Sequence, residues 1–485
     1  MKLKRVLALA LAGTMTVSLA ACGGNSGSGG SGSGDANGGS SSSGTQEAQN
    51  GGADESSDGL ISYVDLDLDK DYKDLTATIS FFNNRTDMDA ADYPGKNWEA
   101  YLADFNELYP NITVEIRTST DYDGEITNEL PSGQYETVTC IRNLDKADLP
   151  VYYMSYGDYD TISQTINYAD NSMYQNQVYG IASTANAGGV VYNKKVFEQA
   201  GITELPKTPD EFLAALQKIK DNCPGVDPLY TNYSDGWALS GQWDAYIGIA
   251  ATGDPKYKNQ KLARTENPFK DYGDNTHAYA VYKILYDAVA QGLTEEDYST
   301  TNWEACKPRM NNGEIGCMVL GSWALPQMKI AGDNPDDVGY MAFPISVDGK
   351  QYAAASADGG YGINVNATDD EKKAALVFVK WLVERSGYAY NEYSLPVVKG
   401  AETQLSFDGV EMITEEPALE GEEDLLNAIN SESEVNIDQD GNGVRLSTLI
   451  EHAANGDMTY DEIVAEWNQA WSDAQESEGV EVTEQ

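Results

Sequence analysis

The sequence predicts an α/β protein in which helices cover the faces of β-sheets. Two β-strand runs, 76–82 and 112–117, flank a stretch whose apolar residues recur at helical spacing until Pro110 ends the helix. This order indicates a β-α-β unit. The same alternation returns farther on, at 340–344, 361–365 and 370–383. A chain of 485 residues has room for two or three such lobes, each with its own core.

The middle of the chain continues the alternation. Strands are expected at 178–181 and 189–192, followed by a short helix at 194–200. A longer helix then begins with Thr208 as its N-cap and Glu211 completing a capping box. Because helices and strands interchange throughout, an all-helical or all-β fold is excluded.

The charge balance narrows the set of partners. There are 78 acidic and 31 basic residues, so the net charge is -47, and such a surface repels polyphosphate. Nucleic acid and anionic membrane surfaces are therefore not expected as partners. Only two histidines occur, which leaves His-based zinc sites and most His-dependent triads without parts. The chain has 31 Tyr against 9 Phe, which fits polar, hydroxyl-rich ligands and fits ordinary surface tyrosines nearly as well.

The first 21 residues have the pattern of a secretory signal. A basic start is followed by an apolar run at 6–21, which is shorter than the roughly 20 residues of a membrane span. The run ends in Leu-Ala-Ala-Cys22, which resembles the bacterial lipobox. That resemblance implies cleavage before Cys22 and attachment of diacylglycerol to its thiol. The alternative is an ordinary signal peptide with a chance cysteine.

Residues 22–59 are expected to form a lipidated cysteine and a tether. Positions 23–59 contain 13 Gly and 10 Ser with no aromatic residue, a composition that cannot build a core. A Gly/Ser coil of this length spans roughly 30 to 36 Å. It would hold a domain at 60–475 away from a lipid surface, and an acidic tail at 476–485 ends the chain.

Disulfide and metal chemistry stay open at two places. The remaining cysteines are Cys140, Cys223, Cys306 and Cys317, and either a Cys306–Cys317 pair or buried free thiols would fit an exported chain of this length. The loop from Asp438 to Asn442 resembles the start of an EF-hand, but position twelve is Leu449 where calcium needs a glutamate. A solvated acidic turn is the expectation there, and no metal or cofactor is predicted.

Enzymatic motifs are missing from the sequence. Outside the Gly/Ser segment there is no GxSxG, and there is no HExxH and no GxxxxGK[ST]. A glycosidase would use two carboxylates, but 78 acidic residues do not single out a pair. We therefore do not expect an enzyme.

Several strings occur in a fixed order along the chain. They are ISFFNN, FNELYPNITVEI, VYGIA, GGVVYNKKVFEQAGI, LPKTPDEFLAAL, MNNGEIGCMVLGSW, GYMAFPI, GGYGINVNATDDEKKAALVFVKWLV and NGDMTYDEIVAEWNQAW. Together, from about residue 74 to 475, they resemble the extracellular solute-binding proteins of family 1, the maltodextrin-binding-like sugar receptors of ATP-binding-cassette importers.

This resemblance implies two α/β lobes joined by a hinge, with the ligand in the cleft between them. Lobe one would take about 74–185 and 338–383, and lobe two about 186–337 and 384–475. The expected protein is a monomer on the extracellular face of the cell membrane, held there by its lipid alone. It would capture an oligosaccharide and deliver it to the permease subunits. The alternatives are a receptor of the same fold for a non-sugar solute and an adhesion or scaffold lipoprotein.

Sugar recognition needs aromatic faces for the CH-rich side of a pyranose and amides or carboxylates for its hydroxyls. Trp323, in LGSW, matches the stacking tryptophan of the maltodextrin binders. Asn83 and Asn84 follow the first strand, where the family places polar contacts, and Asp358 and Tyr361 lie on a glycine-rich loop. For Asn83 and Asn84 the alternative is a turn or an Asx cap.

Four further positions complete the expected site. Asn186 aligns with an acidic ligand residue of the maltodextrin binders, and Trp237, Trp243 and Trp303 lie where lobe two could offer aromatic rings. Packing in a core is the alternative for each tryptophan. After the second helix the chain lacks the Trp-x-x-Asp-Arg arrangement of maltodextrin binders, so a plain maltodextrin is not the expected ligand.

Overall fold

The computed structural model describes residues 60–484, except for 92, 94, 120, 143, 406–408, 420, 423 and 438–442 and the side chains of 237 and 240. The predicted signal peptide, Cys22, the tether and the Asp438–Asn442 loop lie outside the described residues. All described residues belong to one compact unit of the chain, 56–485.

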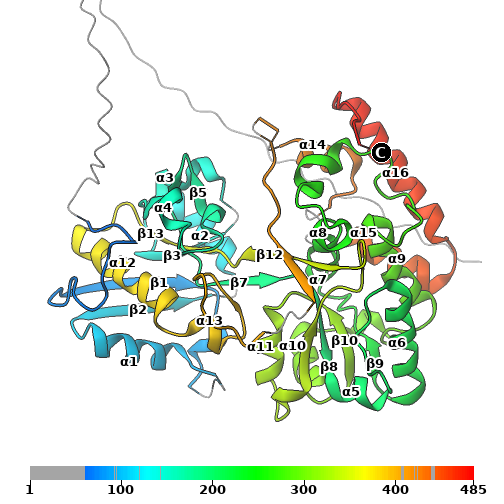
Figure 1. Ribbon diagram of the computed structural model, residues 1–485, viewed down its shortest axis with the longest axis horizontal. Helices are drawn as coiled ribbons and strands as arrows, with labels where there is room; N and C mark the ends of the chain where they lie inside the picture. The colour runs from blue at the N-terminus through cyan, green and yellow to red at the C-terminus, as the bar shows by residue number, and fades with distance from the viewer. Residues whose placement is uncertain are drawn as a thin grey trace, which may run out of the picture. The chain divides into compact units, whose positions relative to one another are not determined.

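The first core is built on a sheet with the order β13-β3-β1-β2 (Figure 1). Its strands are β1 (Ala77–Asn83), β2 (Ile112–Thr118), β3 (Val138–Ile141) and β13 (Gly360–Ile363). β1 runs parallel to both β2 and β3, and β13 runs antiparallel to β3. Helices α1 (Trp98–Leu108) and α12 (Asp369–Glu384) pack on this sheet, where Phe105 and Phe378 meet edge to face. The predicted β-α-β unit is confirmed.

The second core is built on a sheet with the order β11-β8-β10-β9. Its strands are β8 (Val190–Asn193), β9 (Asp227–Leu229), β10 (Ile315–Val319) and β11 (Val338–Met341). β8 is antiparallel to β10 and β11, and β9 is parallel to β10. The segment 338–341 was predicted to lie in lobe one. It forms β11 and pairs with β8 in the second core instead.

A third sheet connects the two cores, with the order β14-β7-β12-β15. Its strands are β7 (Thr184–Ala187), β12 (Gln351–Ala357), β14 (Leu395–Pro396) and β15 (Val410–Ile413). Ala185 on β7 belongs to the first core, and Val190, the first residue of β8, belongs to the second. The chain therefore crosses between the cores along β7, and it returns along the antiparallel strand β12.

The remaining elements are short strands and the helices that cover the cores. A small sheet contains β4 (Gly157–Asp158), β5 (Met173–Tyr174) and β6 (Gln177–Val178). The helices up to the second crossing are α2 (Tyr122–Glu129), α3 (Leu149–Tyr152), α4 (Tyr159–Ile162), α5 (Lys194–Gln199), α6 (Pro209–Asn222), α7 (Trp237–Trp243), α8 (Ile249–Thr252), α9 (His277–Ala290), α10 (Trp303–Asn311) and α11 (Ala324–Ile330). After it come α13 (Tyr388–Asn391), α14 (Leu425–Ser433), α15 (Val444–Asn455) and α16 (Tyr460–Ser477).

The predicted helix starts are confirmed with one correction. Thr208 caps α6 by accepting the N–H of Glu211, as expected. The Glu211 carboxylate, however, accepts the N–H of Lys207 and not that of Thr208, so the predicted capping box is not closed. A complete capping box is found at α12 between Thr368 and Glu371.

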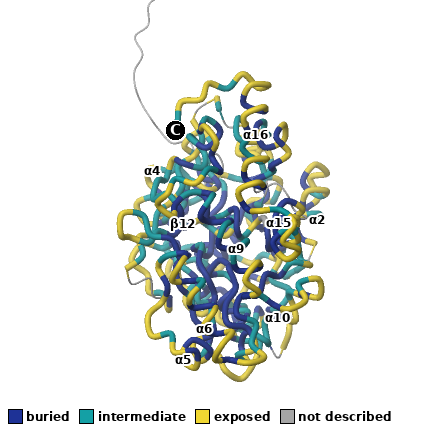
Figure 2. Tube along the Cα trace, turned by 90° about the vertical axis from the view of Figure 1, so that its right-hand side faces the viewer, coloured by how far each residue is buried: buried dark blue, intermediate teal, exposed yellow. Residues whose placement is uncertain are grey.

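Burial follows the two-core arrangement. Figure 2 shows α9 among the most deeply buried segments, and most of its residues contact the second core. The four cysteines at 140, 223, 306 and 317 are buried and unpaired, so of the two alternatives the structure has free thiols. None of the helices in the described part of the chain combines the length and the apolar character needed to cross a membrane.

A buried carboxyl group holds the segment that leads into α7. Glu295 accepts hydrogen bonds from both the backbone N–H and the hydroxyl of Thr231, just after β9. Burial is the largest cause that raises the pKa of Glu295 to about 7, while the hydrogen bonds from Thr231 act in the opposite direction. Its side chain is therefore a pH-sensitive element within the second core.

Glu295 should make stability fall as the pH rises. Between its usual pKa of 4.5 and about 7 the folded chain keeps a proton that the unfolded chain releases. The contribution of Glu295 to the free energy of unfolding is fully present below the pKa of the unfolded chain. It is lost as the pH rises through the pKa of the folded chain, and the total loss is roughly 3 kcal/mol. We expect Glu295→Gln to flatten the decline in the free energy of unfolding between pH 5 and pH 7.5, measured by urea denaturation. The exposed neighbour Glu296, changed to Gln, should keep the wild-type slope; equal slopes in all three proteins would contradict the assignment.

Candidate functional site

Two adjoining cavities lie where the crossing strands meet the second core. The first, here called the Tyr246 cavity, has a volume of about 430 Å³ and is lined by β7, β12, α7 and the 414–417 segment. The second, the Arg85 cavity, has about 400 Å³ and is lined by the ends of β1 and β3, by α11 and by the 388–394 segment. Asn186, Gln242 and Trp323 line both cavities. The two cavities are therefore parts of one cleft.

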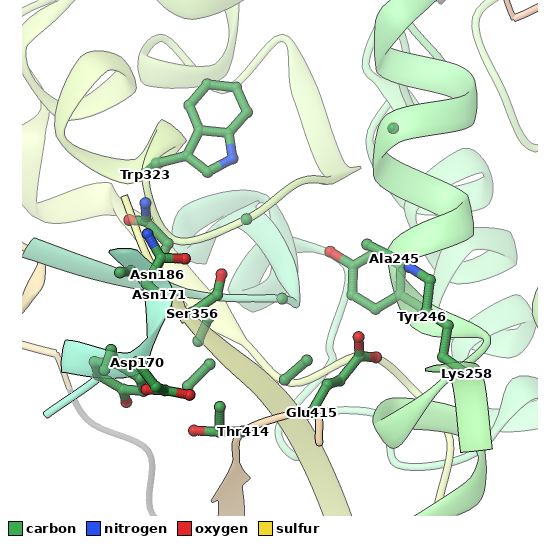
Figure 3. Close-up of a pocket in the computed structure, with 18 of the residues that line it drawn as sticks. Asp170, Asn171, Asn186, Ala245, Tyr246, Lys258, Trp323, Ser356, Thr414 and Glu415 are labelled. Atoms are coloured by element: carbon green, nitrogen blue, oxygen red, sulfur yellow. The ribbon is translucent and has the colours of Figure 1, made fainter. Parts of the chain in front are cut away.

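Trp323 is held at the junction of the cavities by a turn that is bonded to β7. The backbone N–H of Ser322 donates to the carbonyl of Ala187 at 2.8 Å, and the Ser322 hydroxyl accepts the N–H of Ala187 at 3.0 Å. Gly321 is needed beside the indole, because a Cβ there would lie 2.6 Å from Trp323 Cδ1. Figure 3 shows the indole of Trp323 above Asn186 in the close-up.

Asn186 is the polar residue at the centre of the cleft. It lies on β7 opposite Ser356 of β12, and both residues line the Tyr246 cavity (Figure 3). The side-chain oxygen Oδ1 of Asn186 is buried and has no hydrogen-bond partner in the described part of the protein. A buried acceptor without a partner costs on the order of 1 to 3 kcal/mol, so this position favours a ligand that donates a hydrogen bond.

Tyr246 forms a fixed aromatic wall. Its hydroxyl donates to the carbonyl of Gly189 at 2.7 Å and accepts the N–H of the same residue at 2.8 Å. Its ring stacks on Phe343 with the ring centroids 4.3 Å apart. Burial raises the pKa of the Tyr246 hydroxyl, so it stays neutral. Both contacts restrict the ring, and the wall is therefore preorganised for a ligand.

The Arg85 cavity contains a buried ion-pair network. Arg85, which follows β1, pairs with the buried Glu392 at 2.7 Å and with Asp87 through two hydrogen bonds of 2.9 Å. Across the cavity Arg142 lies 3.6 Å from Asp358. Arg85 therefore fixes the end of β1 against the segment after α13, two parts of the cavity wall that are far apart in the sequence.

The cavities contain four of the residues predicted from the sequence. Trp323 and Asn186 line both cavities, and Asn84 and Asp358 line the Arg85 cavity. Asn83 lies beside them but is buried, and its Oδ1 accepts the N–H of Arg85 at 2.9 Å. Asn83 thus forms the Asx turn that was its alternative interpretation. Whether the four lining residues bind a ligand stays a prediction.

The other predicted residues do not line either cavity in the described structure. Tyr361 packs edge to face on Phe81 in the first core, and Trp243 does so on Phe343 in the second. Their burial favours packing over ligand contact. Trp303 lies behind Trp323, with the ring centroids 5.5 Å apart, and supports it. Trp237 begins α7, and its side chain lies outside the described part.

Sequence reasoning missed several cavity residues. Gln242 and Tyr246 lie on and just after α7, in a stretch without helical periodicity, and nothing local marks them. The sequence did contain a signal for Arg85, because this residue directly follows Asn83 and Asn84, which were predicted as site residues. Glu392 lies about 300 residues away from Arg85, and only the fold brings the two together. Within the described residues no group of His, Cys, Asp and Glu side chains could hold a metal ion.

Two cores, crossing strands and a polar cleft with aromatic walls define a receptor for a small solute. The chain belongs to the family of bacterial extracellular solute-binding proteins, whose family model matches residues 91–389. Its fold is the two-lobed type II fold of the solute-binding proteins of ATP-binding-cassette transporters. Members of this family bind and do not transform their solutes, so the chain is not an enzyme.

Several relatives are known. A manno-oligosaccharide-specific solute-binding protein of Bifidobacterium animalis subsp. lactis, solved with mannotriose, is 49% identical with a TM-score of 0.78. A second binding protein of an ABC transporter from that organism, solved with mannobiose, is also 49% identical with a TM-score of 0.79. In each case 86% of this chain and 99% of the relative are covered. The multiple sugar-binding protein of Streptococcus mutans is 26% identical over 322 residues, which are 64% of this chain and 72% of that protein.

The placement of Trp323 can be tested through Gly321. A Cβ at position 321 would overlap the indole, so Gly321→Ala should displace the ring and cost about 1 to 3 kcal/mol of stability as overpacking does. We expect the 19F resonance of 5-fluorotryptophan at position 323, assigned with Trp323→Phe, to shift in this variant.

Gly241→Ala is the matched control, because Gly241 lines the same cavity and an added Cβ there meets nothing within 4 Å. That variant should leave the resonance in place. If both alanine variants shift it equally, or neither does, the geometry described for the Gly321 turn is wrong.

Proposed function

We propose that this chain is the extracellular substrate-binding component of an ATP-binding-cassette importer and that its cleft holds a manno-oligosaccharide. The observation that carries the proposal is the junction of the two cavities. There, a buried amide oxygen without a partner on Asn186 lies next to the indole of Trp323. A pyranose offers what this junction needs, since its CH face stacks on an indole while its hydroxyls donate to an amide oxygen.

The balance of charge in the cleft favours an uncharged ligand. The Tyr246 cavity contains Lys146, Lys258, Asp170 and Glu415, two charges of each sign. The Arg85 cavity repeats this balance with two arginines and two carboxylates. A ligand with a net charge would need an excess of the opposite charge to offset its desolvation. Charged groups that compensate one another can instead bind hydroxyls, as carbohydrates require.

The ligand class is supported by size and by similarity. Two continuous cavities of about 430 and 400 Å³ give room for more than one sugar ring. The two Bifidobacterium relatives, which match nearly half of the aligned positions, were solved with mannobiose and mannotriose. Plain maltodextrin was already disfavoured by the missing Trp-x-x-Asp-Arg arrangement. Short manno-oligosaccharides are therefore the first ligands to test.

The cellular arrangement belongs to the same proposal. Cys22 would receive lipid, residues 23–59 would tether the domain, and the chain would act as a monomer that presents its closed form to the permease. Contacts from both lobes to one ligand stabilise closure, which gives the permease a state to recognise. The predicted lobe limits remain part of the proposal, with 338–341 moved to lobe two because β11 pairs with β8.

The cleft can be tested by calorimetry. We expect mannobiose and mannotriose to bind the purified protein, and maltotriose to bind at least about tenfold more weakly. Trp323→Ala should weaken mannotriose binding by about 2 kcal/mol or more, because an aromatic anchor in a desolvated pocket is removed. Trp381→Ala is a control: this side chain packs on Phe105 and Phe378, and its loss should lower stability by about 3 to 5 kcal/mol without a selective loss of sugar.

If amino acids or peptides bind and no sugar does, the assignment to a solute receptor would still hold, but the assignment of a carbohydrate ligand would be wrong. Undiminished mannotriose affinity in Trp323→Ala would instead remove the stacking role of this residue.

The anchor has its own test. Cys22→Ser removes the thiol that would take the lipid, so the protein should move from the membrane fraction to the medium or stay unprocessed. Metabolic labelling with a radioactive fatty acid, followed by fractionation, measures both effects. A labelled, membrane-bound Cys22→Ser protein would show that the anchor lies elsewhere.

A further inference from the structure

We propose that a third cavity, separate from the two that form the sugar cleft, is a binding site for a small organic anion. This cavity has a volume of about 420 Å³ and lies in lobe two beside the edge strand β11. We call it the lysine pocket because Lys194, Lys207 and Lys329 line it. Among the described residues that line it, no other carries a charge.

Two of the ammonium groups are fixed side by side. Lys329 Nζ donates to the carbonyl oxygen of Pro335 at 2.7 Å, and Lys194 Nζ donates to that of Asp336 at 2.9 Å. Adjacent carbonyls of one turn thus hold two cations together. Burial and the charge of Lys194 lower the pKa of Lys329, and the Asp336 carboxylate partly offsets this effect.

Neither cation forms an ion pair in the described part of the protein, although the Asp336 carboxylate lies close enough to act on the pKa of Lys329. Lys329 is only 8% exposed, and like Lys194 and Lys207 it takes part in no ion pair within the described residues. The whole chain carries 78 acidic residues against 31 basic ones, so a cavity whose described lining contains three lysines and no acid stands out from the rest of the surface. A bound anion would supply a negative charge beside the lysines. It would also accept hydrogen bonds from the ammonium N–H groups that do not donate to the two backbone carbonyls.

The remaining wall is mainly aromatic and apolar, with two amide side chains, Gln351 and Gln404. Tyr192, Tyr340 and Tyr393 line the pocket, together with apolar side chains such as Leu205 and Leu325. Tyr393 holds Lys329 Nζ 4.8 Å above its ring and has a φ of 49°, a left-handed conformation that is rare for an aromatic residue. Such a wall suits the flat or apolar body of a ligand whose charged group reaches the lysines.

The lysine pocket and the sugar cleft lie on opposite sides of a shared wall. Along α11, Pro326 and Gln327 line the Arg85 cavity, whereas Leu325 and Lys329 line the lysine pocket. The segment after α13 alternates in the same way, because Glu392 and Ser394 face the cleft cavity and Tyr393 the lysine pocket. No described residue lines both, so an anion here is not a subsite of the sugar cleft.

The ligand class follows from these contacts. Two fixed ammonium groups and a third at position 207 call for a carboxylate, phosphate or sulfate group, and the tyrosines call for a ring or an apolar portion attached to it. Benzoate is the simplest probe with both parts. Benzyl alcohol lacks its charge, and inorganic sulfate lacks its ring.

The test is titration calorimetry at constant ionic strength with these three probes. Benzoate should bind, and both benzyl alcohol and sulfate should bind more weakly. Lys194→Met and Lys329→Met should each weaken benzoate at least about tenfold, since each removes one charge-assisted contact. Lys195→Met is the matched control, because Lys195 is the next residue along the chain and pairs with Glu198 outside the pocket. This control should bind benzoate as the wild type does.

The outcomes separate this site from the sugar cleft. Trp323→Ala should keep its benzoate affinity even where it loses mannotriose, so either proposal can fail alone. Absence of benzoate binding, or equal losses in Lys194→Met and Lys195→Met, would overturn the anion site. Sulfate or benzyl alcohol binding as tightly as benzoate would overturn the assignment to an organic anion. If Lys329→Met does not fold, Lys194→Met decides, because its side chain is exposed and its loss leaves the core intact.

Discussion

The antiparallel pairing of β7 with β12 is the constraint on which the rest of the site depends. It sets Asn186 opposite Ser356, so both project from the connection between the cores into the cleft. At the end of β7, Ala187 bonds through both its N–H and its C=O to Ser322 and so positions the turn that carries Trp323. The same carbonyl accepts the hydroxyl of Tyr340 on β11. One crossing strand thus fixes the polar centre of the cleft, its indole and the sheet edge behind it.

Charge is distributed differently in the cleft and in the lysine pocket. In the Arg85 cavity both arginines lie within ion-pair distance of carboxylates, and Arg85 contacts the buried Glu392 where water is largely excluded. In the lysine pocket, on the other side of α11, the described lining contains three lysines and no acid. A wall only one helix thick therefore separates an environment suited to neutral, hydroxyl-rich ligands from one suited to an anion. If both sites bind their ligands, binding at one site would influence the other through α11 and the segment 392–394.

Local patterns predicted the elements well and the site in part. β1, α1 and β2 followed from periodicity, and Trp323 followed from its match to the stacking tryptophan of the maltodextrin binders. Tyr361 and Trp243 had equally suggestive surroundings but are buried, because their orientation is set by Phe81 and Phe343 from distant segments. Tyr246 and Glu392 acquire their places only through long-range contacts, to Gly189 and Arg85. β11 was assigned to the wrong side, since which neighbour a strand pairs with is not written in its own residues. The family resemblance predicted that a cleft exists, but the residues that form its walls could be identified only from the folded structure.

The central claim is that a sugar ring lies on Trp323 while one of its hydroxyls donates to Asn186. A crystal structure of the protein with mannotriose tests it most directly. The account predicts a pyranose stacked on the indole, a hydroxyl within hydrogen-bond distance of Asn186 Oδ1, and further rings extending into the Tyr246 or the Arg85 cavity. Mannotriose bound elsewhere, or bound in the cleft with Asn186 Oδ1 still unpaired and the indole uncovered, would contradict it.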